Sequence, residues 1–212
     1  MKGSSKFSPE DFRSFLGVSR ETLDQLVCYN NLLRKWQKAI NLVSGRSLDD
    51  CWRRHFLDSG QLFKHLPDEA SSVLDIGSGA GFPGLVLAIM GASNVVLVES
   101  DQRKCLFLTE VSRETSTAVT IINDRIENIS HETFDVVTSR ACAPLNVLLE
   151  YARPYLGETT VCLFPKGRSF DEELTTAKKR WNMEYSLLES ASDSAARIVR
   201  LEGIFNERPS TE

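Results

Sequence analysis

The chain has 212 residues and a formal net charge of −4, with 42% hydrophobic and 25% charged residues. This composition is typical of a globular protein of one domain, or one domain with an appendage, and excludes a chain too polar to fold. No apolar run approaches the roughly 18 residues of a membrane span, and the first residues lack the apolar stretch of a secretory signal. The five scattered cysteines form no Cys-x-x-Cys pair, which argues against a disulfide framework or a zinc site. We therefore expect a cytoplasmic protein without metal or membrane contact, in which a local basic patch supplies any attraction for nucleic acid.

Residues 1–70 predict an N-terminal helical cap. Ser8 and Pro9 are typical of the start of a first helix. From Ser19 to Ile40 apolar residues recur three or four positions apart, which predicts a longer amphipathic helix. Ser47 is the expected cap of a third helix over residues 48–66, which Pro67 ends. Trp36 and Trp52 lie on these helices, and we interpret them as core residues rather than as platforms for RNA bases.

Residues 71–212 predict a different architecture. Short apolar strands alternate with amphipathic helices, the strands at 72–76, 94–100, 118–123, 134–140 and 160–167, the helices at 83–90, 101–115, 144–156 and 169–181. Two further strands follow within 183–203 without a helix between them, so they should pair antiparallel at one edge. The alternation predicts an α/β fold with a doubly wound, mostly parallel sheet, helices on both faces, and the cap packed on it as one compact unit.

The segment DIGSGAGFPG at residues 75–84 follows the first strand, where such sheets bind ligands. Its last three glycines fit the dinucleotide fingerprint, and Glu99 stands where an acid would contact a ribose. Asp75, however, would place a negative charge beside a pyrophosphate, which is unfavourable, whereas beside an ammonium or sulfonium it is favourable. We therefore favour S-adenosylmethionine as the ligand. A dinucleotide-dependent oxidoreductase or a non-catalytic nucleotide-binding module stays open as an alternative.

Several segments together resemble one family. In chain order they read WQKAINLVS, RRHFLDS, DIGSGAGFPG, ESDQRKCLFL, DRIE, SRACAPL and FPKG. The set is similar to the bacterial small-subunit rRNA guanine-N7 methyltransferases (RsmG, formerly GidB), over most of the chain. The resemblance implies the seven-stranded methyltransferase sheet, S-adenosylmethionine as cofactor, and N7 of one guanine in 16S rRNA as the methyl acceptor. A small-molecule methyltransferase with the same sheet is the alternative.

The resemblance also implies which residues form the site. Gly77 and Phe82 stand at the positions that contact the cofactor, Gly79 shapes the loop, and Glu99 stands at the ribose position. Ile126 and Glu127 match the pair that lines the adenine. Arg140 matches an arginine that reaches both the cofactor and the active site.

Methylation at N7 needs no general base, because guanine N7 carries a lone pair and no hydrogen. Positioning and electrostatics should then supply most of the rate. The sequence lacks the Asn/Asp-Pro-Pro-Tyr segment that enzymes acting on exocyclic amino groups carry after the fourth strand. Cys142, which lies between alanines, is interpreted as a small packing residue rather than a covalent nucleophile.

Four residues are candidates for contact with the substrate. Arg140 and Lys166 could recognise guanine or phosphate and serve as the catalytic pair. His55 is either a base or phosphate donor, or a structural residue that bonds Asp58. Arg125 is either an RNA contact or the partner of Asp124. The expected partner is 16S rRNA or a small-subunit particle, bound by a monomer through basic residues near the cofactor mouth.

Overall fold

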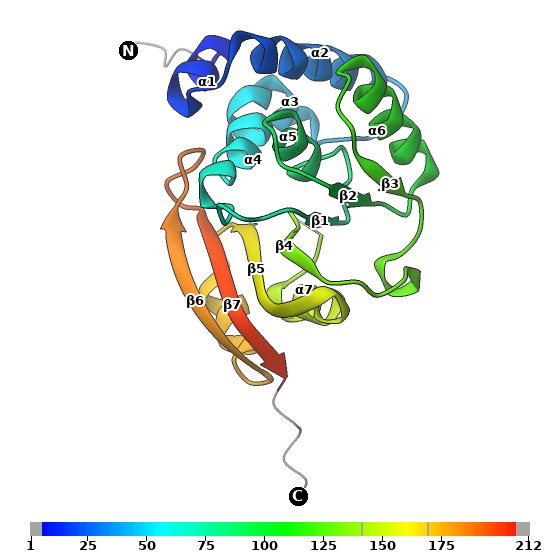
Figure 1. Ribbon diagram of the computed structural model, residues 1–212. Coiled ribbons are helices and arrows are strands. Elements are labelled where there is room, and N and C mark those ends of the chain that lie inside the picture. Colours follow the sequence, from blue (N-terminus) through cyan, green and yellow to red (C-terminus); the bar gives the residue numbers. More distant parts are fainter. Residues whose placement is uncertain (1–5, 141, 169, 207–212) are drawn as a thin grey trace, which may run out of the picture.

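The computed structural model describes residues 6–140, 142–168 and 170–206 (Figure 1). Two predicted features reach beyond them: Ala141 of the SRACAPL segment and Ser169, the expected first residue of a helix, lie outside the described residues. The strands are β1 (Val73–Ile76), β2 (Val95–Val98), β3 (Thr120–Ile122), β4 (Phe134–Thr138), β5 (Leu156–Lys166), β6 (Trp181–Glu189) and β7 (Arg197–Asn206).

The strands form one seven-stranded sheet in the order β3-β2-β1-β4-β5-β7-β6. β1 to β5 pair in parallel, while β7 inserts antiparallel between β5 and β6. Every residue of the central strand β1 is buried, as expected for a parallel sheet with both faces covered. This topology confirms the predicted methyltransferase-type sheet and its antiparallel edge.

Helices cover both faces of the sheet. After the cap come α5 (Gly84–Ile89), α6 (Gln102–Glu114), α7 (Leu145–Ala152) and α8 (Phe170–Ala177). α5 and α6 bury Leu85 and Phe107 in one hydrophobic cluster, and α7 and α8 bury Leu148 and Leu174 in another. Figure 1 shows α5 and α6 on the side of the cap helices and α7 on the opposite side.

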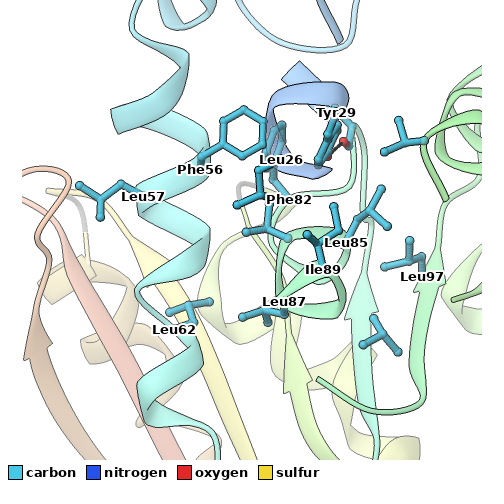
Figure 2. Close-up of a cluster of buried hydrophobic side chains, with 14 of the residues drawn as sticks. Leu26, Tyr29, Phe56, Leu57, Leu62, Phe82, Leu85, Leu87, Ile89 and Leu97 are labelled. Atoms are coloured by element: carbon cyan, nitrogen blue, oxygen red, sulfur yellow. Dashed lines mark hydrogen bonds between the residues drawn. The ribbon is translucent and has the colours of Figure 1, made fainter. Parts of the chain in front are cut away.

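The cap comprises α1 (Pro9–Leu16), α2 (Arg20–Trp36), α3 (Gly45–Asp49), a π-helical turn η1 (Trp52–Leu57), α4 (Asp58–Gly60) and a 3-10 turn η2 (Phe63–His65). It shares one hydrophobic cluster with the sheet domain: in Figure 2, Tyr29 and Phe56 of the cap lie against Phe82 and Leu85. Trp52 is buried. Trp36 packs edge-on against Phe107 of α6 and donates to Glu110 over 2.8 Å. Trp52 therefore lies in the core, as predicted, and the partly buried Trp36 packs against it.

The structure corrects three predicted helix boundaries. α2 ends at Trp36 because the Gln37 side chain accepts hydrogen bonds from the amides of Leu42 and Val43 and so turns the chain. The predicted helix over 48–66 is broken into four pieces, and its cap is Ser44, which accepts from the Ser47 amide, rather than Ser47 itself. The helix expected to reach Trp181 stops at Ala177, and Trp181 instead begins β6.

Candidate functional site

Two cavities open at the carboxyl ends of the parallel strands. The first, here called the loop cavity, has a volume of about 350 Å³ and is lined among others by Gly77, Gly79, Glu99, Ile126, Glu127 and Tyr151. The second, the cap cavity, has a volume of about 510 Å³ and is lined among others by Arg54, His55, Asp58, Lys166, Glu173 and Asp193. Arg140 and Cys142 line both cavities, so the two spaces meet at the end of β4.

The glycine loop gives the loop cavity its floor. Gly77, Gly79 and Gly81 all have positive φ angles, of 67°, 58° and 89°, a region that residues with a Cβ avoid. A Cβ on Gly77 would lie 2.7 Å from Sγ of Cys142. The amide of Gly79 donates to Oε2 of Glu99 over 2.9 Å. The backbone of the loop is therefore tied to the end of the neighbouring strand and lies directly against the cavity.

The side chain of Asp75 does not point into the cavity, and the predicted orientation is wrong. It is fully buried, and its Oδ2 accepts a hydrogen bond from the Gly84 amide at the start of α5, over 3.0 Å. Its other oxygen has no partner among the described residues. Burial raises the pKa of this carboxyl to about 7. Asp75 therefore supports the loop from beneath through the Gly84 amide.

Glu99 has the position that sequence reasoning gave it. It follows β2, lines the loop cavity, and accepts from the amides of Gly79 and Asp101 over 2.9 and 2.8 Å. Nζ of Lys104 lies 4.0 Å from its Oε2. A carboxylate accepts about four hydrogen bonds, so Glu99 retains capacity for a hydroxyl donor.

The short turn η3 (Ile126–Asn128) forms the wall opposite the glycine loop. Both Ile126 and Glu127 line the loop cavity, as does Arg125. The turn is held by the Tyr155 hydroxyl, which donates to the Ile126 carbonyl over 2.6 Å. Arg125 forms an exposed ion pair with Glu127, 3.2 Å long, while Asp124 accepts from the Arg125 amide rather than from its guanidinium. These contacts bring Arg125 to the cavity rim.

Phe82 is placed differently from the other loop residues. Its side chain is buried and stacks with the rings of Tyr29 and His55, at centroid distances of 5.3 and 4.9 Å. The guanidinium of Arg140 lies 5.0 Å from its ring centroid on a cation–π contact. The Phe82 side chain is therefore part of the support for Arg140 and does not line the loop cavity.

Arg140 is held from several directions at the junction of the cavities. Its Nη1 donates to the Arg54 carbonyl over 3.0 Å and lies 3.5 Å from Oδ2 of Asp58. Its Nη2 lies 2.9 Å from Nδ1 of His55. These contacts fix a delocalised positive charge where the two cavities meet.

His55 is buried, and its pKa falls to about 3, first because of burial and then because of Arg140 and Arg54. The ring is therefore neutral at physiological pH. The expected hydrogen bond between His55 and Asp58 is replaced by contacts of both residues with Arg140. This environment favours the structural interpretation of His55 over that of a base or phosphate donor.

Lys166 lines the cap cavity, although its ammonium is already engaged. It donates to the Ala143 carbonyl over 3.1 Å and to Oε2 of Glu173 over 2.9 Å. The same Glu173 oxygen accepts from the Leu145 amide at the start of α7. Lys166 thus ties the end of β5 to the chain between β4 and α7, and contributes positive charge to the cavity wall.

Cys142 is exposed and lines both cavities, so the predicted packing role is wrong in part. Its sulfur does pack on the loop at Gly77. Partial desolvation of the thiol in the cavity wall raises its pKa, which keeps it protonated and a poor nucleophile at neutral pH. The structure therefore gives Cys142 a place in the wall between the cavities.

The turn between β6 and β7 was expected from its Ser/Asp composition, but its part in the site was missed. Ser192 donates to Oδ1 of Asp58 over 2.6 Å, and Asp193 pairs with Arg54 at 3.2 Å, so this distant turn closes one side of the cap cavity. The one available signal was the Ser/Asp composition, which predicts a turn but not what it contacts. Within the described residues, no His, Cys, Asp and Glu side chains gather to hold a metal ion, and no helix is both long and apolar enough for a membrane span.

The chain is similar over most of its length to known proteins of one family. A family model described as GidB, rRNA small subunit methyltransferase G, matches residues 22–198. A protein of Paramagnetospirillum magneticum named ribosomal RNA small subunit methyltransferase G is 51% identical over 200 residues, which cover 94% of this chain and 98% of its own. One of the same name from Rhodospirillum rubrum is 48% identical over 194 residues, covering 92% of this chain and 96% of its own.

Solved structures are similar in fold at low sequence identity. The PH0226 protein of Pyrococcus horikoshii is 13% identical with a TM-score of 0.62, covering 79% of this chain and 98% of its own. A TehB-like SAM-dependent methyltransferase from Corynebacterium glutamicum is 16% identical with a TM-score of 0.54, covering 84% of this chain and 98% of its own. These likenesses support the fold alone.

Proposed function

Because the chain belongs to the rRNA small subunit methyltransferase G family, we propose that it transfers a methyl group from S-adenosylmethionine to N7 of one guanine in 16S rRNA. Family membership makes the chain an S-adenosylmethionine-dependent methyltransferase of small-subunit rRNA. The assignment to guanine N7 is our own. The observation that carries it is the meeting of two cavities at Arg140 and Cys142, one suited to the cofactor and one lined by three cations that are each paired with a carboxylate.

The loop cavity suits S-adenosylmethionine in shape and in donor set. Its glycine backbone allows a close approach, Glu99 offers a carboxylate to the ribose hydroxyls, and Ile126 with Tyr151 offers apolar surface to the adenine. Bound there, S-adenosylmethionine supplies an electrophilic methyl group. The chain's part is to hold that group at the boundary with the cap cavity, beside Arg140.

The cap cavity suits a single base that has left its RNA stack. Its volume of about 510 Å³ lies in the range of small-molecule sites, and enzymes that modify a base inside folded nucleic acid take it out of the stack. Arg54, Arg140 and Lys166 line it, each paired with a carboxylate, and their remaining N–H donors suit the RNA backbone and the O6 acceptor of guanine. In this proposal Arg140 and Lys166 orient the guanine so that N7 faces the methyl group.

The titratable groups of the cap cavity favour a reaction without proton removal. His55 is neutral and bonded to Arg140. Asp58 accepts from Ser192 and faces Arg140, and Asp193 is paired with Arg54. Each group is thus already committed to a neighbour. A guanine N7 lone pair can attack the methyl carbon in line without any of them acting as a base.

The test is methyl transfer to small-subunit particles purified from cells that lack the gene. With labelled S-adenosylmethionine, we expect one guanine of 16S rRNA to gain the label at N7, located by strand cleavage at the modified base. Arg140→Gln should lower the rate roughly 100-fold, as for loss of one preorganised charge contact. Lys178→Gln is the matched control, because Lys178 contacts Tyr185 at the sheet edge and lies in neither cavity wall. Label on another atom, or N7 methylation that is already complete in such cells, would refute the proposal.

Salt dependence offers a second test of RNA binding. If Arg54 and its neighbours neutralise phosphates, the logarithm of the binding constant should fall linearly with the logarithm of salt concentration, with a slope of roughly −0.7 per phosphate contact for single-stranded RNA. A flat dependence between low and moderate salt would contradict a basic RNA track.

A further inference from the structure

We infer that His55 and Asp58 are positioning residues that hold the guanidinium of Arg140 in one orientation at the boundary of the two cavities. Neither residue needs to touch cofactor or RNA for this role. The inference depends on the proposed function for its kinetic test but not for its spectroscopic test.

The π-helical turn η1 makes this arrangement possible. In it the Asp58 amide bonds to the Arg53 carbonyl, five residues earlier, so the turn is wider than an α-helical one. The Arg54 carbonyl, the His55 ring and the Asp58 carboxylate then all face Arg140, at 3.0, 2.9 and 3.5 Å. Three acceptors from five consecutive residues thus contact the Arg140 side chain, which follows β4.

The chemistry of the pair determines which proton His55 carries. Arginine is always a donor, so Nδ1 of His55 must accept and the imidazole proton must sit on Nε2. That nitrogen is buried and has no partner among the described residues, so a second proton would place an unpaired charge beside Arg140. The lowered pKa of His55, about 3, agrees with this geometry.

The Arg54 carbonyl, His55, Asp58 and Phe82 together form what we call the clamp of Arg140. The Asp58 side of this clamp is itself held in place. Oδ1 of Asp58 accepts from the Ser192 hydroxyl over 2.6 Å, which leaves Oδ2 toward Arg140. The guanidinium carbon of Arg140 also lies over the Phe82 ring, 5.0 Å from its centroid. A guanidinium has five N–H donors, and these contacts leave Nε–H and part of Nη2 for a ligand. The clamp therefore fixes which edge of Arg140 a ligand meets.

Two substitutions separate this role from packing. His55→Asn keeps an acceptor near the Nδ1 position but loses the ring, whereas His55→Phe keeps the ring stacked on Phe82 but loses the acceptor. If His55 positions Arg140, His55→Phe should lower kcat roughly 10- to 100-fold with little change in S-adenosylmethionine affinity by calorimetry, and His55→Asn should keep more of the turnover. The same two substitutions at exposed His131, outside both cavity walls, are the matched control. The reverse order, with His55→Phe the more active variant, would overturn the inference.

A double-mutant cycle tests the link to Arg140 directly. In an Arg140→Gln background, His55→Phe should cause no further loss of kcat, because the group that it positions is gone. Losses that multiply would overturn the inference. If the wild-type protein transfers no methyl group to rRNA, the proposed function fails, and the next measurement still decides the inference.

Nitrogen NMR of the free protein needs neither substrate nor variant activity. The chain has three histidines, so the imidazole signals of His55 can be assigned by their loss in His55→Asn. We expect the Nε2–H tautomer, unchanged from pH 8 to pH 5, and an altered Nδ1 signal in Arg140→Gln. An Nδ1–H tautomer, or protonation of His55 within that range, would overturn the inference.

Discussion

Replacing Gly77 by alanine tests how tightly the two cavities share their wall. Gly77 has a φ of +67°, and an L-residue in this left-handed region loses about 1–2 kcal/mol. The new Cβ would also lie 2.7 Å from Sγ and 3.3 Å from Cβ of Cys142, and overpacking of this kind costs about 1–3 kcal/mol. The sum predicts that Gly77→Ala lowers the free energy of unfolding by about 2–5 kcal/mol.

The two contributions can be separated with Cys142→Ala. In the double variant, removing the sulfur should recover the free energy of unfolding that Gly77→Ala loses through overpacking, while the loss due to the positive φ remains. The assay is urea unfolding followed by circular dichroism, with S-adenosylmethionine affinity measured by calorimetry on the same proteins. A loss below 0.5 kcal/mol for Gly77→Ala would refute the reasoning, and so would a double variant no more stable than Gly77→Ala alone.

Three further predictions concern the free energy of unfolding. The pKa of Asp75 is about 7 in the folded protein, above its unfolded value, so the protonated carboxyl stabilises the fold below about pH 4 and this contribution is lost as pH rises through 7. The free energy of unfolding of the wild type, relative to that of Asp75→Asn, should therefore fall between pH 4 and pH 7 by on the order of 4 kcal/mol. A difference that is constant with pH would contradict this. Asp135 accepts from the amides and hydroxyls of Ser71 and Ser72, which lower its pKa, so Asp135→Ala should lose about 1–3 kcal/mol at pH 7 and progressively less as pH falls through the folded pKa. Phe56→Ala should remove about 3–5 kcal/mol from a single unfolding transition, and a separate cap transition in calorimetry would contradict one compact unit.

The sheet and the cofactor side of the site were predictable because their signals are local. Alternation of apolar runs with amphipathic segments predicts parallel strands, and the glycines of the loop require positive φ wherever they fold. Glu99, Ile126 and Glu127 end up around the loop cavity because each follows a parallel strand at the same edge of the sheet. Position along the chain predicted the place of Glu99, whereas Ile126 and Glu127 were named from the family resemblance.

The rest of the site depends on contacts that no local pattern carries. The π-helical turn differs from an α-helix by one shifted hydrogen bond. The spacing of apolar residues does not predict such a shift. Asp75 turns toward Gly84 rather than the cavity because the start of α5 lies directly beneath the loop. The partners of Arg140 come from a segment more than eighty residues earlier in the chain. Such pairings are set by tertiary packing, so the sequence named Arg140 as a candidate but did not predict the residues that hold it.

The turn between β6 and β7 has a consequence for the order in which the nascent chain completes its two cavities. All the residues named here that line the loop cavity have been synthesised once Tyr151 has been added to the chain. The cap cavity must wait for Ser192 and Asp193, which come from the last tenth of the chain that the structure describes. During translation, every named residue of the loop cavity is therefore synthesised before the turn that closes the cap cavity.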